Sequence, residues 1–103
     1  MDQVRTALVG CGKVGHIHAQ ALATLGESRF VAACDVDLER AAAFGSRYGI
    51  RPYDDVARML EENAVQALLI GTPHPLHAGP AIMAAEAGVH VLVEKPLAAV
   101  NKV

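Results

Sequence analysis

The most informative stretch of this chain is Ala7-Leu8-Val9-Gly10-Cys11-Gly12-Lys13-Val14-Gly15. An apolar run typical of a buried strand leads into three glycines at the spacing G-x-G-x-x-G, and a helical pattern begins directly behind them. The first glycine permits a tight turn, the second permits backbone to approach a pyrophosphate, and the third permits close packing of helix on strand. A second apolar run ends in Asp35, twenty residues after the last glycine. The free N–H groups of the helix N-terminus favour an anion, so the pattern predicts a dinucleotide site with Asp35 bonded to the ribose hydroxyls.

Strand-like and helix-like patterns alternate along the whole chain. We expect strands over residues 4–9, 30–34, 50–53, 67–70 and 89–93. We also expect a helix between each strand and the next along the chain. One apolar face of the first helix is marked by Val14, Ile17, Ala21 and Leu25. Either Asp54 or Asp55 is expected to cap the third helix. Right-handed crossovers turn this order into an α/β fold, a Rossmann-type doubly wound parallel sheet of about five strands.

Composition excludes several classes of protein. The 103 residues are 52% hydrophobic and 19% charged, which argues against disorder. The net charge is −2 with no basic block, which argues against a nucleic-acid partner. The start of the chain lacks a signal-peptide pattern and no apolar run is long enough to cross a membrane, so a cytoplasmic protein is expected. Cys11 and Cys34 end neighbouring predicted strands, so they are expected to lie close together as reduced thiols.

Histidine spacing does not favour a metal. His16 and His18 are two residues apart on a helix and therefore point to different faces. His74 and His77 are better spaced, but Pro75 interrupts the local geometry and no further ligand is near in sequence. No metal site is predicted.

Three segments together resemble the N-terminal half of the glucose-fructose oxidoreductase / inositol dehydrogenase (Gfo/Idh/MocA) family. They are Gly10–Gly15, the turn Gly71-Thr72-Pro73-His74-Pro75-Leu76-His77, and Val93-Glu94-Lys95-Pro96-Leu97. The resemblance covers essentially the whole chain, and the Glu-Lys-Pro ending is more specific than the glycines. It implies a nicotinamide-dependent oxidoreductase whose small-molecule substrate is a sugar, a cyclitol or a related polyol.

The resemblance also implies roles for individual residues. The pyrophosphate turn is implied to consist of Gly10, Gly12, Lys13, Val14 and Gly15, with Asp35 at the ribose. Thr72, Pro73 and His77 are implied to lie beside the nicotinamide. Glu94 and Lys95 are implied to stand near the reacting carbon, where Lys95 is the catalytic residue that binds the substrate hydroxyl and assists its proton transfer. Such a role is chemically reasonable, because a desolvated lysine has a lowered pKa.

NAD is favoured over NADP because Asp35 and Asp37 repel a 2′-phosphate, although Arg40 keeps NADP as the second choice. Residues 1–96 are expected to form the dinucleotide-binding domain, and residues 97–103 to begin a connection to an absent substrate domain. The chain is then expected to bind cofactor without turnover, with an unpaired fifth strand at the sheet edge and a tendency to form a homo-oligomer.

Two alternatives remain open. The first is a stand-alone nucleotide-binding or sensor module, or a subunit that another chain completes. The second is a different dehydrogenase with a similar first domain, against which the Glu-Lys-Pro ending counts.

Overall fold

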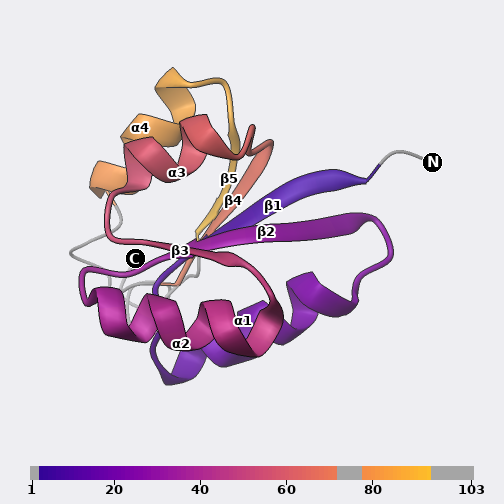
Figure 1. Cartoon of the computed structure of the whole chain (residues 1–103). Helices are drawn as coiled ribbons and strands as arrows, with labels where there is room; N and C mark the ends of the chain where they lie inside the picture. Colours follow the sequence, from indigo (N-terminus) through magenta and orange to yellow (C-terminus); the bar gives the residue numbers. More distant parts are fainter. Residues whose placement is uncertain (1–2, 72–77, 94–103) are drawn as a thin grey trace, which may run out of the picture.

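The computed structural model describes residues 3–71 and 78–93, and these form one parallel sheet with helices on both faces (Figure 1). The elements are β1 (Val4–Val9), α1 (Lys13–Thr24), β2 (Ser28–Cys34), α2 (Leu38–Tyr48), β3 (Arg51–Tyr53), α3 (Val56–Glu62), β4 (Ala67–Ile70), α4 (Ala78–Glu86) and β5 (His90–Val93). The strand order is β3-β2-β1-β4-β5, so the predicted doubly wound sheet is confirmed. No helix within these described ranges is long and apolar enough to span a bilayer.

β1 is the central strand and hydrogen-bonds to a parallel neighbour on each side. It pairs with β2 from Val4 opposite Ser28, with a register irregularity between Thr6 and Ala7. On its other side it pairs with β4, beginning with Thr6 opposite Ala67. The strand order therefore reverses at β1, which is where open α/β sheets bind their ligands.

Each face of the sheet has its own core, because successive side chains of a strand point to opposite faces. On one face, Ala7 and Val9 of β1 join Met59 of α3 and Ala84 of α4. On the other face, Leu8 joins the residues of α1 and α2, chiefly Ala19, Ala41 and Phe44. Figure 1 shows the same division, with α1 and α2 on one side of the strands and α3 and α4 on the other.

The buried face of α1 differs from the prediction. Val14, Ile17 and Leu25 are 48%, 67% and 53% exposed, whereas Gly15 and Ala19 are buried. The physical reason is proximity: α1 approaches the strands through its smallest residues, which leaves no room between helix and sheet for large side chains. The apolar spacing along this helix therefore indicated the wrong face.

Two aspartates cap the next helices. The Asp37 carboxylate accepts a hydrogen bond from Glu39 N at 3.0 Å at the start of α2. The Asp55 carboxylate accepts from Arg58 N at 3.2 Å at the start of α3, so Asp55 rather than Asp54 is the cap. Asp37 and Asp55 thus satisfy N–H groups that the first turn of a helix leaves without an intrahelical partner.

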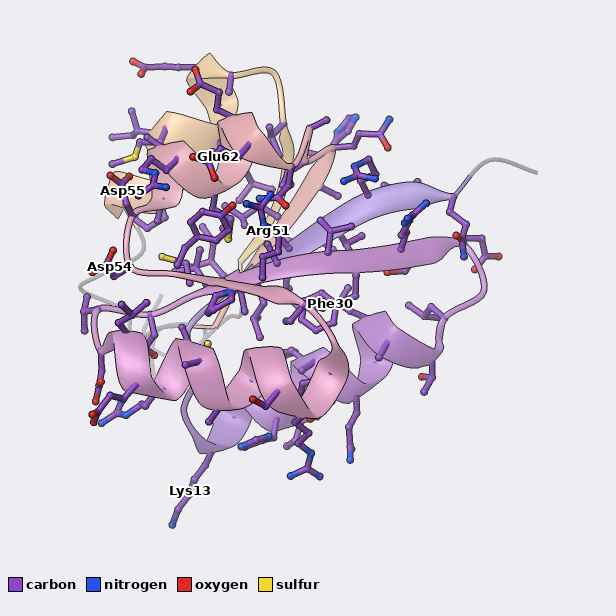
Figure 2. All side chains as sticks on the ribbon, in the orientation of Figure 1. Lys13, Phe30, Arg51, Asp54, Asp55 and Glu62 are labelled. Atoms are coloured by element: carbon purple, nitrogen blue, oxygen red, sulfur yellow. The ribbon has the colours of Figure 1, made fainter. Side chains whose placement is uncertain are left out.

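A polar cluster joins β3 to α3 (Figure 2). The Tyr53 hydroxyl donates to Glu62 Oε1 at 2.8 Å and accepts from Asn63 Nδ2 at 3.0 Å. Glu62 also pairs with Arg58 at 3.1 Å and with Arg51 at 3.6 Å. The Tyr53 hydroxyl, followed by Arg58, lowers the pKa of the Glu62 carboxyl below its ordinary value.

One part of the sheet is left uncovered on the α1 side. An apolar hollow of about 200 Å³ lies between the end of α1 and the strands, with Leu22, Leu25, Leu69 and Leu92 in its lining. Leu92 of β5 is 68% exposed. β5 lies at one edge of the described sheet, as the sequence predicted, and β3 lies at the other.

Candidate functional site

The carboxyl ends of β1, β2 and β4 meet at the point where the strand order reverses. Gly10 N, directly after β1, donates to Cys34 O of β2 at 2.8 Å. Gly71 N, directly after β4, donates to Val9 O of β1 at 2.8 Å. These two bonds hold the turn after β1 between the ends of its neighbours. A crevice at this position is the ligand site of open parallel sheets.

The three glycines of the turn differ in what surrounds them. Gly10 has φ +107°, a conformation that favours glycine. A Cβ on Gly15 would overlap the carbonyl oxygen of Gly10 and lie 3.2 Å from its carbonyl carbon, so this contact of α1 with β1 needs glycine. A Cβ on Gly12 would meet no atom within 4 Å, and Gly12 is exposed. Gly12 therefore presents bare backbone to open space, which suits close approach of a phosphate group.

The N-terminus of α1 opens onto the same space. Gly12 is its N-cap, and no side chain in the described part of the protein makes a capping hydrogen bond there. Lys13 and Val14 follow as exposed residues, and Figure 2 shows the Lys13 side chain extending away from the sheet. This turn thus offers an anion two things: backbone N–H groups and the positive end of the helix dipole.

Asp35 links the turn to the end of β2. It is only 7% exposed. Its Oδ2 accepts from Cys11 N at 2.8 Å and its Oδ1 accepts from Asp37 N at 2.8 Å. Asp35 therefore does not cap α2, which Asp37 does. Because a carboxylate oxygen has two lone pairs, both oxygens retain the capacity to accept a further hydrogen bond.

The two cysteines lie where the sequence placed them, at adjoining strand ends. Cys11 Sγ donates to Cys34 O at 3.6 Å, and both thiols are free and buried. Burial, followed by the nearby charge of Asp35, raises the pKa of each thiol to about 12. Both therefore stay protonated at neutral pH, so neither supplies a thiolate to the chemistry of the site.

Acidic residues outnumber basic ones around the end of β2. Asp54 and Asp55 follow β3 and add to the negative charge that raises the pKa of Cys34. Asp37 pairs with Arg40 at 3.8 Å, and both side chains are largely exposed. The one guanidinium in this group is thus already partnered by a carboxylate.

The first helix carries two histidines with different surroundings. The His16 ring lies 4.3 Å from the Phe44 ring, centroid to centroid, and its Nδ1 is 3.3 Å from the Tyr48 hydroxyl. His18 instead lies against Gly71 at the end of β4. The described residues contain no cluster of three or more side chains suited to hold a metal ion.

Five predicted site residues fall outside the described part of the chain: Thr72, Pro73, His77, Glu94 and Lys95. Two features escaped the sequence analysis altogether. They are the bond from Cys11 N to Asp35 and the contact of His18 with Gly71. Neither carries a local signal, because each joins residues that are more than twenty positions apart.

Comparison with known proteins places this geometry in a family. Residues 4–102 match the model of the Gfo/Idh/MocA proteins, described as "Oxidoreductase family, NAD-binding Rossmann fold". The chain belongs to this family. The predicted resemblance is thereby confirmed along almost the whole sequence.

Individual relatives agree with that assignment. D-apiose dehydrogenase of Paraburkholderia graminis is 39% identical over 99 residues, covering 95% of this chain and 26% of that protein. The WlbA dehydrogenase of Bordetella pertussis, solved with NADH and UDP-GlcNAcA, has a TM-score of 0.85 at 38% identity, covering 92% of this chain and 30% of that one. KijD10, a 3-ketoreductase of Actinomadura kijaniata solved with NADP, has a TM-score of 0.84 at 31% identity, covering 93% and 31%. The chain thus spans between a quarter and a third of the length of these relatives.

Proposed function

We propose that this chain is the cofactor-binding part of an oxidoreductase that transfers hydride between a nicotinamide dinucleotide and a sugar, cyclitol or related polyol. The observation that carries the proposal is the hydrogen bond from Cys11 N to Asp35 Oδ2 at 2.8 Å. It joins the glycine turn to the acid after β2 at the reversal of strand order. The backbone that would bind phosphate and the carboxylate that would bind ribose therefore lie side by side at the position where open parallel sheets bind their ligands.

The residues present fit a dinucleotide. The pyrophosphate would lie on the turn of Gly10, Gly12 and Gly15, where the open side of Gly12 admits it. Lys13 and Val14 would contribute their backbone N–H groups from the first turn of α1. Asp35 would accept hydrogen bonds from the adenosine ribose through its remaining lone pairs.

NAD is the better match to the charges of the site. A 2′-phosphate would add about two negative charges beside Asp35, which accepts a hydrogen bond from Asp37 N. Asp54 adds a further negative charge, because it acts together with Asp35 in raising the pKa of Cys34. Arg40 is the nearest basic residue in sequence and is paired with Asp37. Repulsion among like charges therefore favours the unphosphorylated ribose of NAD over NADP.

The chemical step is proposed from the family pattern. The bound cofactor would supply or accept a hydride. Lys95 would hold the substrate hydroxyl and exchange its proton, with Glu94 beside it, while Thr72, Pro73 and His77 border the nicotinamide. We assign residues 1–96 to the dinucleotide-binding domain and 97–103 to the start of a connection to a substrate domain. The chain matches 26% of D-apiose dehydrogenase and 30% of the WlbA dehydrogenase, which supports a further domain in proteins of this family.

The proposal is tested by titrating the chain with NADH and with NADPH while recording melting temperature. A ligand at 100 times its Kd adds about 2.7 kcal/mol to stability when it binds only the folded state. We expect NADH to raise the melting temperature more than NADPH at equal concentration. Asp35→Ala should weaken NADH binding by roughly 10-fold or more, the range lost with a hydrogen bond to a charged group.

Asp54→Ala is the matched control, because Asp54 is an exposed acid at the same edge of the sheet. It should leave NADH binding within about twofold of the unaltered chain. A folded chain that responds to neither nucleotide would refute the proposal. Equal losses in the Asp35 and Asp54 variants would refute the ribose role of Asp35.

A further inference from the structure

His18 occupies the junction between α1 and the end of β4. Its residue is half-buried and its Nε2 atom is buried. A Cβ added to Gly71 would lie 3.1 Å from His18 Cδ2 and 3.7 Å from His18 Nε2. The imidazole therefore packs directly on the backbone where β4 ends. No side chain larger than hydrogen fits at Gly71 unless the ring shifts.

This contact lies across β1 from the one that Asp35 makes. Asp35 holds the glycine turn on the β2 side, through Cys11 N. His18 stands on the β4 side, where Gly71 N is bonded to Val9 O at 2.8 Å. The carboxylate thus contacts the turn itself on one flank, whereas on the other flank the imidazole contacts the end of β4.

The two flanks correspond to the two halves of a dinucleotide. In a doubly wound sheet the ligand crosses the point of strand reversal, so that each half of the sheet receives one mononucleotide. Asp35 belongs to the half that receives the adenosine. The end of β4 belongs to the half that receives the nicotinamide, and the His18 ring of α1 packs there against Gly71.

We propose that His18 is a positioning residue for the nicotinamide half of the cofactor. It acts through the spacing that it imposes between α1 and Gly71. This inference rests on the proposed function and deepens it, since it adds a residue that the glycine pattern does not include. Loss of the ring should let α1 and β4 approach one another and displace the nicotinamide side while leaving the pyrophosphate turn in place.

Two ligands separate these effects. ADP-ribose carries the adenosine, the pyrophosphate and a second ribose but lacks nicotinamide, whereas NADH carries all of them. Both are titrated by calorimetry into the unaltered chain and into His18→Ala, with melting temperature recorded for each protein. We expect ADP-ribose affinity to stay within about twofold, and NADH affinity to fall about tenfold towards that of ADP-ribose.

Further variants protect the test against general loss of structure. His18→Gln keeps a long polar side chain and should restore most of the NADH affinity. Adding Gly71→Ala to His18→Ala places a methyl group in the vacated space and should also recover part of it. Ile17→Ala is the matched control on the same helix, because Ile17 is 67% exposed, and should change neither affinity.

Three results would overturn the inference. An equal fall for both ligands in His18→Ala would show a general effect on the turn, and no fall for either would show that the ring positions nothing. Equal affinity of the unaltered chain for both ligands would show that the nicotinamide gains nothing from this site. Failure of the unaltered chain to bind ADP-ribose at all would instead refute the proposed function itself.

Discussion

Two alanine substitutions in the glycine turn should separate folding from binding. At Gly15 the added methyl group would overlap the carbonyl oxygen of Gly10 and lie 3.5 Å from Phe44 Cζ. The obstructing atom belongs to the backbone and cannot rotate away, so α1 would have to move from β1 by roughly 1 Å. At Gly12 the same methyl group meets nothing within 4 Å.

The magnitudes follow from these surroundings. Overpacking a core typically costs about 1–3 kcal/mol, and a clash with rigid backbone belongs at the upper end. A loss of about 3 kcal/mol lowers the melting temperature of a domain of this size by roughly 12–24 °C. Gly12 has φ −86° and ψ −161°, a conformation open to alanine, so Gly12→Ala should cost at most about 1 kcal/mol as a weaker N-cap.

NADH binding, unlike stability, should be sensitive to the substitution at Gly12. Gly12→Ala places its methyl group on the surface proposed for the pyrophosphate, and NADH affinity should fall at least about tenfold. The assay is urea denaturation for stability and calorimetric titration for NADH, on the same protein preparations. Stability of Gly15→Ala within 1 kcal/mol of the unaltered chain would refute the packing argument. Unchanged NADH affinity in Gly12→Ala would refute the assignment of the open side of the turn.

Three other features make separate predictions. The lowered pKa of Glu62 means that its stabilising contribution is present above about pH 4.5 and is lost as the pH falls through the lowered value. Glu62→Gln should therefore flatten the acid limb of a plot of stability against pH, whereas the control Glu61→Gln should leave that limb steep. The raised pKa of about 12 for Cys11 and Cys34 predicts negligible alkylation by iodoacetamide at pH 9 unless urea is added, and rapid labelling of the folded chain would contradict it. The same shift predicts a loss of stability above pH 9, because only the thiols of the unfolded chain ionise there. Leu92→Lys should reduce concentration-dependent self-association in sedimentation velocity, because it places a charge on an exposed apolar edge strand. Undiminished self-association of this variant would assign the contact to another surface.

The sequence predicted the strands better than the packing of the helices. Short apolar runs bounded by turn residues placed all five strands within two residues of their observed starts. The glycine turn was equally accessible, because Gly10 and Gly15 meet local steric demands. The buried face of α1 was not, since the large side chains of Val14 and Ile17 point outward while Gly15 and Ala19 face the sheet. Helical spacing assumes that the largest apolar residues are buried, and that assumption fails where helix and sheet lie very close.

The candidate site was predictable in its parts but not in its connections. Asp35 and Asp37 lie two residues apart just before α2, and only the structure shows that Asp37 caps this helix while Asp35 reaches the turn. The role proposed for His18 depends on Gly71, which lies fifty-three positions further along the chain. Contacts of that separation are set by the order of strands in the sheet, which hydrophobic periodicity does not encode.

The central position of β1 also determines when this chain can fold during its synthesis. β1 is made before the other four strands of the described sheet, but its partner β4 comes only at Ala67–Ile70. At about 5–20 residues per second, the segment between them takes roughly 3–12 s to synthesise. Throughout that interval one side of β1 has no strand to pair with, although β2 can already occupy the other. The strand at the middle of the finished sheet is therefore an open edge in the nascent chain, and it is the edge that chaperones would have to protect.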